Sequence, residues 1–205
     1  IIAIKDAKAD EASFIALTKK VLDGAKDAKL ILISDNAATL TAATKACADR
    51  KPLIFGATLD NAGDMAAAAK DSGCVLGVKG SNLDNAVEIT EKLLGEGLKD
   101  LAIDTGARTM RASLEDNIVA RKAAVTKKFK PLGFPTINFP CEMTDDPLME
   151  AMIASVLIAK YAGIIILSDL QGDILFPLFL ERLNIFTDPQ RPMVVEEDIY
   201  PLNGP

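Results

Sequence analysis

The chain has 205 residues, a net charge of −6 at pH 7 and no histidine. Nucleic-acid binding needs a basic face that replaces counterions, and the acidic balance of this chain argues against such a function. The lack of histidine removes the commonest general base, and with it Ser–His–Asp and Cys–His catalysis.

The predicted strands are short apolar runs, which recur roughly every 20–25 residues and are separated by Ala- or Lys-rich helical patterns. Unbroken apolar runs of this length are typical of strands buried on both faces of a parallel sheet. Repeated strand–helix units predict a (β/α)8 TIM barrel or a doubly wound sheet. In chain order the runs are Ile1–Ile4, Leu30–Ser34, Pro52–Gly56, Val75–Val78, Leu101–Asp104, Phe134–Phe139, Ile164–Ser168 and, more weakly, Met193–Val195.

Helix signals lie between these runs. Asp10 or Ser13 can begin the first helix, which is expected to stop near Gly24. A long helix is expected over about Ser113–Phe129, and a shorter one over Leu175–Leu183.

An acidic group precedes another predicted helix. Glu142, Asp145 and Asp146 could together bind a hard cation. Pro147 follows directly, however, and proline is favoured at the first helical position, so Asp146 is better explained as a helix N-cap.

The three cysteines, Cys47, Cys74 and Cys141, are far apart and form no Cys-x-x-Cys pair. This chain alone therefore shows no iron–sulfur or zinc site, and its cysteine usage fits a reduced cytoplasmic compartment. No signal peptide is visible, and no apolar run approaches the roughly 20 residues that a membrane span needs. We expect a cytoplasmic protein without membrane or nucleic-acid partners.

The length and both ends of the chain bear on its domain organisation. A complete eightfold barrel usually needs about 250 residues, so a barrel of this length would be compact or truncated. The chain opens on Ile1 without a methionine and stops at Pro205, just after a stretch that contains proline and glycine. Both ends favour a fragment of a longer protein.

Polar residues follow the predicted strands, at the end of a barrel where active sites lie. Asp104 ends a strand and is followed by Gly106 and Arg108, a pattern that could hold a polar heterocycle or an anion. Helix caps and turns require the same residue types, and that structural role is the more common one. The candidate rim residues are Asn36, Asn61, Asp104, Arg108 and Asn138.

Three stretches carry a family resemblance: Arg50–Thr58, Leu101–Arg108 and, above all, Asn184–Glu197, which reads NIFTDPQRPMVVEE. They resemble the large (gamma) subunit of the corrinoid/iron–sulfur protein of the carbon monoxide dehydrogenase/acetyl-CoA synthase system. The resemblance covers nearly the whole chain.

The resemblance implies a large subunit of three parts: an N-terminal [4Fe–4S] module, a central TIM barrel and a C-terminal domain that helps hold cobalamin. This chain would be the barrel over residues 1–190, and residues 191–205 would be a linker strand leading into the missing corrinoid domain. The family has a further strand before the one that matches Ile1–Ile4, so the barrel would be incomplete. Both cofactors would be held outside this chain, and no catalytic, cofactor-binding or metal-binding residue is carried over.

The resemblance also implies a methyl-carrier role. The complex takes a methyl group from methyltetrahydrofolate, or from tetrahydrosarcinapterin in archaea, through a methyltransferase and delivers it to acetyl-CoA synthase. The barrel would be a scaffold that docks the small subunit and meets the methyltransferase and acetyl-CoA synthase.

Two other functions remain open from the residues. One is a pterin-binding TIM-barrel methyltransferase in its own right, because amides and the Asp104 carboxylate on one rim would suit the edge of a pterin. The other is a truncated aldolase-like barrel, which would want a strand-end lysine, and Lys79 is the candidate. Analogy of fold is weak support for either function.

Overall fold

The computed structural model describes residues 1–185, in which strands and helices alternate along the chain. The strands are β1 (Ile2–Lys5), β2 (Leu30–Ile33), β3 (Leu53–Ala57), β4 (Val75–Lys79), β5 (Leu101–Asp104), β6 (Ile137–Asn138) and β7 (Ile164–Ile165). The helices are α1 (Glu11–Gly24), α2 (Ala37–Lys45), α3 (Ala62–Ser72), α4 (Leu83–Gly95), α5 (Met110–Thr126), α6 (Pro147–Ala159) and α7 (Gly172–Asn184). Short 3-10 helices are η1 (Ala48–Arg50), η2 (Lys130–Leu132) and η3 (Pro140–Glu142).

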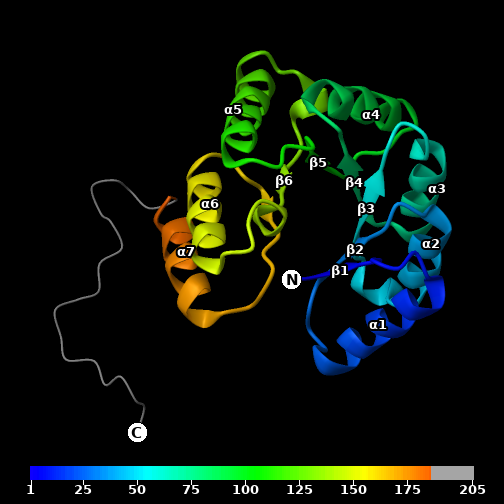
Figure 1. Cartoon of the computed structure of the whole chain (residues 1–205). Coiled ribbons are helices and arrows are strands. Elements are labelled where there is room, and N and C mark those ends of the chain that lie inside the picture. Colours follow the sequence, from blue (N-terminus) through cyan, green and yellow to red (C-terminus); the bar gives the residue numbers. More distant parts are fainter. Residues whose placement is uncertain (186–205) are drawn as a thin grey trace, which may run out of the picture.

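The strands follow one another in space in the order of the sequence. β1 to β5 form one parallel sheet in the order β1-β2-β3-β4-β5, and β6 pairs in parallel with β7. An isolated bridge between Ile103 and Thr136 joins β5 to the residue before β6. Figure 1 shows the helices as an arc outside the strands, open between α1 and α7. Sequential order is that of a β/α barrel, whereas a doubly wound sheet reverses its order.

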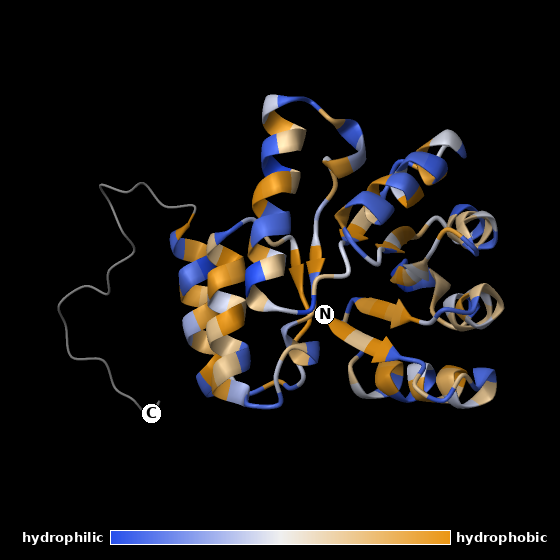
Figure 2. Ribbon diagram, turned by 45° about the horizontal axis from the view of Figure 1, so that its top comes forward, coloured by the Kyte–Doolittle hydropathy of each residue, from blue (hydrophilic) through white to orange (hydrophobic). Residues whose placement is uncertain are grey.

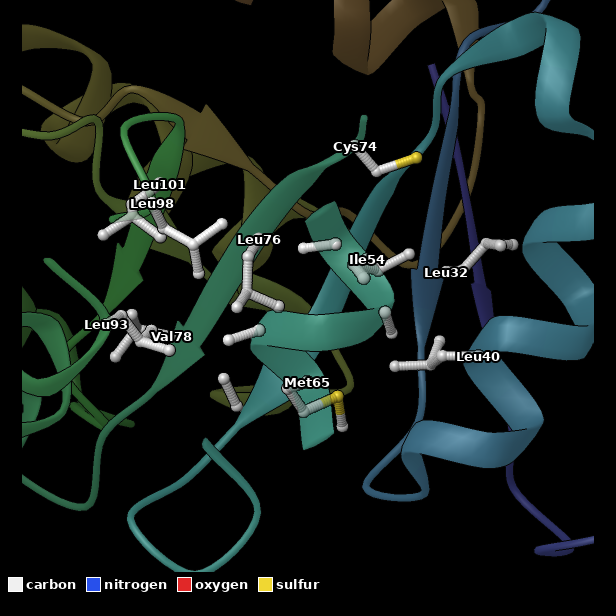
Figure 3. Packing of buried hydrophobic residues seen from close by; sticks show 14 of the residues in the cluster. Leu32, Leu40, Ile54, Met65, Cys74, Leu76, Val78, Leu93, Leu98 and Leu101 are labelled. Carbon is white, nitrogen blue, oxygen red and sulfur yellow. The ribbon is translucent and has the colours of Figure 1, made fainter. Parts of the chain in front are cut away.

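The helices bury one face of the strands in an outer core. Leu32, Ile54 and Leu76, on three neighbouring strands, are fully buried there. Figure 3 shows Leu40 of α2 and Met65 of α3 packed against them. Each buried side chain of this size contributes about 1.5–3 kcal/mol, so this layer supplies much of the driving force for folding.

The opposite face of the strands forms an inner core, which consists of Ile31, Phe55, Ala102, Ile137 and Phe139. Side chains alternate between the faces of a strand, so Ile31 lies in the inner core and Leu32 in the outer one. The rings of Phe55 and Phe139 lie with their centroids 5.3 Å apart. Gly77 leaves room for this pair, because a Cβ atom there would lie 2.5 Å from Cδ2 of Phe55.

Most predicted elements are confirmed, and the helix caps agree with the sequence. The Asp10 side chain accepts a hydrogen bond from the Ser13 backbone N–H, so Asp10 rather than Ser13 caps α1. The Asp146 side chain accepts from the Leu148 N–H at the start of α6. The long helix α5 starts three residues earlier than predicted, because Thr109 serves as its cap.

Two predicted strands are shorter in the structure. The run 134–139 forms a strand only at β6, and the run 164–168 only at β7. Pro135 has no N–H to donate, and Pro140 begins η3, so prolines limit β6 at both ends. The predicted strand Met193–Val195 lies outside the described residues.

The last two helices carry apolar residues on exposed positions. Figure 2 shows α6 and α7 coloured largely as hydrophobic, unlike the mixed helices around β1–β5. On α7, Phe176, Phe179 and Leu183 are each more than half exposed and lie at helical spacing along one stripe. No helix within residues 1–185 has the length and hydrophobicity needed to cross a membrane.

The contact between Gly77 and Phe55 gives a stability prediction. Gly77→Ala should destabilise the fold by about 1–3 kcal/mol, because the added methyl group overpacks the inner core. Urea unfolding followed by circular dichroism measures this change. A second substitution, Phe55→Leu, should restore part of the loss in the double variant, because it shortens the side chain that the methyl group meets.

Gly95 at the end of α4 is the matched control. A Cβ atom there meets nothing within 4 Å. Gly95→Ala should therefore be neutral or stabilising by up to about 1 kcal/mol. Equal effects of the two Gly→Ala changes would contradict the role assigned to Gly77.

Candidate functional site

Charged side chains gather where the strands end, at the mouth of the inner core. Asp104 follows the inward-facing Ala102 by two residues, so it also faces inward. Lys5 follows Ile4, which packs in the outer core, so Lys5 faces the opposite way, toward the interior. Because these strands are parallel, their last residues lie at the same end of the sheet, where the strands finish.

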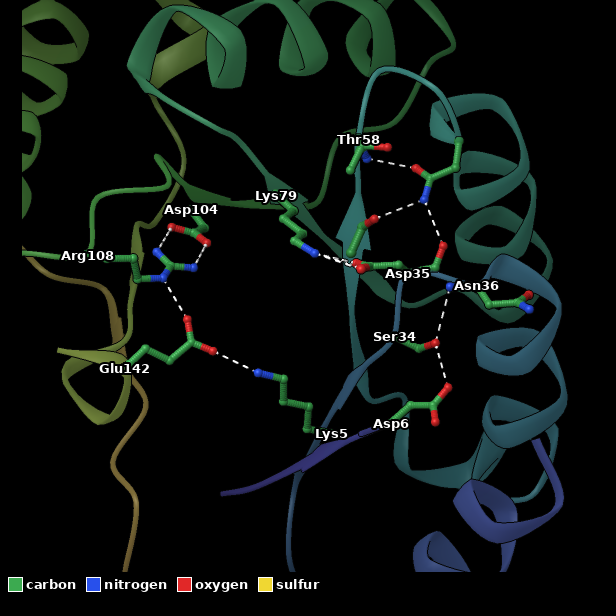
Figure 4. A network of polar contacts seen from close by, with 12 residues as sticks. Lys5, Asp6, Ser34, Asp35, Asn36, Thr58, Lys79, Asp104, Arg108 and Glu142 are labelled. Carbon is green, nitrogen blue, oxygen red and sulfur yellow. Dashed lines mark hydrogen bonds and ion pairs between the residues drawn. The ribbon is translucent and has the colours of Figure 1, made fainter. Parts of the chain in front are cut away.

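Arg108 and Glu142 connect this mouth through a chain of four charges (Figure 4). Arg108 donates from Nη1 and Nη2 to the two carboxylate oxygens of Asp104, at 3.0 and 2.7 Å. Its Nε donates to Oε2 of Glu142 at 2.6 Å. Lys5 Nζ donates to the other oxygen of Glu142 at 2.9 Å. This row of ion pairs therefore joins the end of β1 to η3 and to the loop after β5.

The loop after β5 is held by the same carboxylate. The Gly106 N–H donates to Oδ1 of Asp104 at 2.8 Å. Gly106 has a φ of 79°, and a Cβ atom there would meet the backbone of Gly80 and Ser81. Glycine is therefore required at this position by the close approach of that backbone.

The surroundings of Arg108 and Glu142 favour their charged forms. Asp104 is only 1% exposed, and a buried carboxylate needs the bidentate partner that Arg108 supplies. Burial disfavours the charged form of Arg108, but the hydrogen bonds with Asp104 and then Glu142 outweigh it and raise its pKa. Burial likewise disfavours the Glu142 carboxylate, but hydrogen bonds from Lys5 and Arg108 lower its pKa below the ordinary value of 4.5.

The Arg108 side chain also packs over an aromatic ring of the inner core. Its guanidinium carbon lies 4.7 Å from the centroid of the Phe139 ring. Phe139 is part of the inner core and contacts Phe55. The position of the charge chain thus depends on the packing of the inner core.

A second polar cluster joins the exits of β2, β3 and β4 (Figure 4). Lys79 Nζ donates to both carboxylate oxygens of Asp35, at 2.6 and 2.8 Å. Asn61 Nδ2 donates to the carbonyl oxygens of Asp35 and Gly56, each at 3.1 Å, and its Oδ1 accepts from the Thr58 N–H at 2.7 Å. Asn61 therefore binds backbone groups from two neighbouring loops.

The five predicted rim residues do not come together at one place, and Asn61 belongs to the second polar cluster. Asp104 and Arg108 are brought together in the charge chain. Asn36 caps α2 and accepts from the Ala38 and Thr39 N–H groups, which is the structural alternative considered from the sequence. Asn138 lies apart from the charge chain, because its Oδ1 accepts from Nδ2 of Asn117 on α5 at 3.2 Å.

The sequence did not single out Lys5, and it assigned Glu142 to a different group. Glu142 pairs with Lys5 and Arg108, whereas Asp146 caps α6. Lys5 could have been recognised as the first residue after an apolar run, since the inward position at a strand end is a common place for a charged side chain. Nothing in the sequence indicates that it meets a residue 137 positions away.

The cysteines do not fit an iron–sulfur cluster. Cys47 and Cys74 lie in the outer core, whereas Cys141 packs on the inner core, across the sheet. Burial, aided by nearby acidic groups, raises the pKa of the Cys47 and Cys141 thiols to about 11. A [4Fe–4S] cluster needs four thiolates at one place. Among residues 1–185 no group of three or more His, Cys, Asp or Glu side chains could hold a metal ion.

The charge chain predicts a pH-dependent stability. Glu142→Gln should lower the free energy of unfolding by about 1–2 kcal/mol at pH 7, because Arg108 and Lys5 lose a charged partner. The folded-state pKa of Glu142 is lowered, so this contribution is present above pH 4.5 and is lost as the pH falls through the folded-state value. Urea unfolding of both proteins between pH 7 and pH 3 measures the difference.

Glu115 supplies a matched control, because it forms a largely exposed ion pair with Arg111 on α5. Glu115→Gln should change stability far less than Glu142→Gln at any pH, because water screens an exposed pair. A loss as large as that of Glu142→Gln, or a Glu142→Gln effect that grows toward pH 3, would contradict the assignment.

Comparison with known proteins shows the family to which this chain belongs. The family model described as the CO dehydrogenase/acetyl-CoA synthase delta subunit matches residues 1–205. The corrinoid/iron–sulfur protein large subunit of Moorella thermoacetica is 35% identical over 198 residues, which cover 97% of this chain and 44% of that protein.

Archaeal proteins are similar over comparable lengths. The acetyl-CoA decarbonylase/synthase complex subunit gamma of Methanopyrus kandleri is 25% identical over 214 residues, which cover 100% of this chain and 46% of that protein. The same subunit of Methanocaldococcus jannaschii is 28% identical over 178 residues, 76% of this chain and 36% of that protein. The chain thus spans less than half the length of these relatives. It belongs to the CO dehydrogenase/acetyl-CoA synthase delta subunit family and is similar to a corrinoid/iron–sulfur protein large subunit.

Proposed function

We propose that this chain is the scaffold barrel of a corrinoid/iron–sulfur protein. The whole protein would carry a methyl group from methyltetrahydrofolate or tetrahydrosarcinapterin to acetyl-CoA synthase. The observation that carries the scaffold role is the mutual pairing of the charged side chains at the barrel mouth. Lys5, Arg108 and Lys79 are the cations of the two clusters, and Glu142, Asp104 and Asp35 are their partners.

These contacts have a structural purpose. Asp104 accepts hydrogen bonds from a backbone N–H and from the partly exposed Arg108 guanidinium, and Asn61 bonds three backbone groups, which supports a loop-fixing role for both. A general acid or base must instead reach a reacting atom and exchange a proton with it. A corrinoid, when bound by the whole protein, supplies the methyl-carrying chemistry itself, and the barrel contributes position.

The proposal extends to domains and partners. Residues 1–190 would form the barrel, and residues 191–205 would link it to a corrinoid domain, with a [4Fe–4S] module elsewhere in the polypeptide. Relatives are named as subunits of acetyl-CoA synthase complexes, which supports partners of that kind. We propose the small corrinoid-protein subunit, the methyltransferase and acetyl-CoA synthase as the proteins that dock here, in the cytoplasm.

We also propose that one further strand–helix unit closes the barrel in the whole protein. β1 pairs only with β2 among the described strands, and its other edge is free. The Ile2 and Asp6 N–H groups donate toward β2, so alternation directs those of Ala3 and Lys5 toward the free edge. Helix α7, which carries the exposed apolar stripe, borders the same opening (Figure 1), and exposed apolar surface of this kind would favour an added helix there.

Hydrogen exchange tests this closure. The Ala3 and Lys5 amides should exchange at least about ten-fold more slowly in the full-length protein than in the 205-residue chain, because a neighbouring strand would accept their hydrogen bonds. The Leu76 amide is the control, since it already donates to the Asp100 carbonyl inside the sheet. Equal exchange of Ala3 and Lys5 in both proteins would rule the closing strand out.

Calorimetry separates the scaffold from a pterin-binding methyltransferase. We expect no saturable heat when methyltetrahydrofolate is titrated into the chain, whereas the small corrinoid-protein subunit should associate with it. Micromolar binding of methyltetrahydrofolate that Asp104→Asn abolishes and Asp35→Asn preserves would overturn the scaffold proposal. Asp35 is a suitable control because it is also a rim carboxylate, paired with Lys79 instead of Arg108.

A further inference from the structure

The C-terminal half of α5 and the segment that follows it form a basic region in an acidic chain. Between Asp116 and Glu142 the sequence contains no acidic residue, although the whole chain has a net charge of −6. Five cations lie in this stretch, and all of them are exposed: Arg121, Lys122, Lys127, Lys128 and Lys130. The sequence of this region therefore has the opposite sign of charge from the chain as a whole.

None of these five cations forms an ion pair with another residue in the described part of the chain. The cations of the mouth, by contrast, are all paired with carboxylates. Lys127 and Lys128 lie at the C-terminal end of α5, where the helix dipole favours a cation. Arg121 and Lys122 precede the last turn, and Lys130 lies beyond the helix in η2, so the dipole does not account for them. Their charges are available to a partner.

Exposed apolar residues lie among these cations on α5. Ile118 is 40% exposed and Val125 is 57% exposed. Together with Arg121 and Lys122 they follow the spacing i, i+3, i+4 and i+7, which places all four on one side of the helix. The buried residues of α5 lie on the opposite side, and Figure 2 shows hydrophilic and hydrophobic residues alternating along this helix. We call these four residues the α5 basic face.

An aromatic ring orders the arginine of this face. The guanidinium carbon of Arg121 lies 5.7 Å from the centroid of the Tyr161 ring, and Tyr161 is itself 53% exposed. A guanidinium that lies over a ring keeps N–H groups at its edge, which can still bind a carboxylate. Because the side chain is already held, less conformational entropy is lost when a partner binds it.

The residue that ends the helix adds a further charge at some cost in strain. Lys128 lies one turn after Val125 and has a φ of 52°, the left-handed conformation in which glycine is usual at the end of a helix. The Phe129 N–H donates to the Ala123 carbonyl at 3.1 Å and closes this turn. A lysine at this position therefore supplies a cation where glycine would fit the backbone better.

We propose that the α5 basic face docks an acidic amphipathic helix of a partner protein. Apolar side chains of that helix pack on Ile118 and Val125, as ridges of one helix pack into grooves of another. Its carboxylates bind Arg121, Lys122 and Lys128, and charges of opposite sign steer the encounter.

This surface lies away from the charge chain of the mouth. Helix α5 begins after the end of β5 and must return to the start of the next parallel strand, so its C-terminal end lies at the other end of the sheet. The docking proposal therefore goes beyond the scaffold role of the mouth and does not depend on it.

A protein helix fits this surface better than the other partners that a basic patch can bind. The net charge of −6 opposes binding to nucleic acid and to anionic membranes. Helices that lie on membranes also present Trp, Phe or Leu, whereas this face has only Ile118 and Val125. A second copy of α5 would have to offer Glu115, which already bonds Arg111 of its own helix at 2.9 Å.

The test uses a synthetic peptide of three Leu-Glu-Ala-Leu-Glu-Glu-Ala heptads as the probe on the full-length protein. Fluorescence anisotropy should show saturable binding, with a dissociation constant below about 100 μM at low salt. Raising the salt from about 0.02 to about 0.2 M should weaken binding at least about ten-fold, because salt screens exposed charges. Peptides with glutamine for every glutamate, or with alanine for every leucine, should each bind at least about five-fold more weakly.

Paired charge variants locate the binding. Arg121→Gln/Lys122→Gln should weaken it at least about ten-fold, because two of the docking cations are lost. Lys19→Gln/Lys20→Gln removes the same charge from exposed positions on α1 and should change the dissociation constant by less than about two-fold.

The apolar contact and the strained lysine have separate tests. Val125→Ser should weaken binding, whereas Leu17→Ser, at a position on α1 that is 45% exposed, should not. Lys128→Gly should weaken binding about two- to five-fold while leaving the urea midpoint unchanged or higher, because glycine suits the positive φ. A purely structural role of Lys128 would not separate these two readouts.

Four outcomes would overturn the proposal. The first is no saturable binding of the peptide, and the second is an equal loss in the α1 and α5 charge variants. The third is tighter binding of an oligonucleotide or of anionic phospholipid vesicles that Arg121→Gln/Lys122→Gln abolishes. The last is a dimer in analytical ultracentrifugation that the same variant dissociates, which would assign the face to a second copy. Circular dichroism of each variant separates loss of binding from loss of folding. Because the probe contains neither pterin nor corrinoid, these outcomes leave the proposed methyl-carrier role unaffected.

Discussion

Burial of the strands on both faces is the constraint on which the rest of this structure depends. Helices must cover the outer face, and the inner face must be filled by side chains from the strands themselves, such as Phe55 and Phe139. Charged residues then have room only where a strand ends. Lys5, Lys79 and Asp104 each occupy the last position of their strand, so the polar mouth is a direct result of the apolar interior.

At that mouth, electrostatics favours pairing within the protein. Asp104 is buried and bonds Arg108 through both carboxylate oxygens, and the Arg108 guanidinium lies over the ring of Phe139. The resulting network sets the loops after β1, β5 and β6 relative to one another. The pairing leaves the charges of the mouth neutralised within the protein, which supports the proposed scaffold role.

Hydrophobic runs predicted β1 to β5 well, because a strand buried on both faces leaves a plain signal in the sequence. The runs around β6 and β7 predicted strands that are longer than the observed ones. Hydrophobicity alone does not show that Pro135 lacks an N–H or that a 3-10 helix begins at Pro140. Helix caps such as Asp10 and Asp146 depend on residues a few positions away and were predictable. The partners of Glu142 come from distant segments, so no local pattern could identify them.

The bond between Lys5 and Glu142 joins residues 137 positions apart, whereas each strand from β1 to β5 pairs with the next strand along the chain. During synthesis the neighbouring strands can associate as they leave the ribosome, one unit after another. The bond across the mouth has to wait until η3 has emerged. Because contacts between distant residues form slowly, we expect the mouth to be completed after the neighbouring strands have paired.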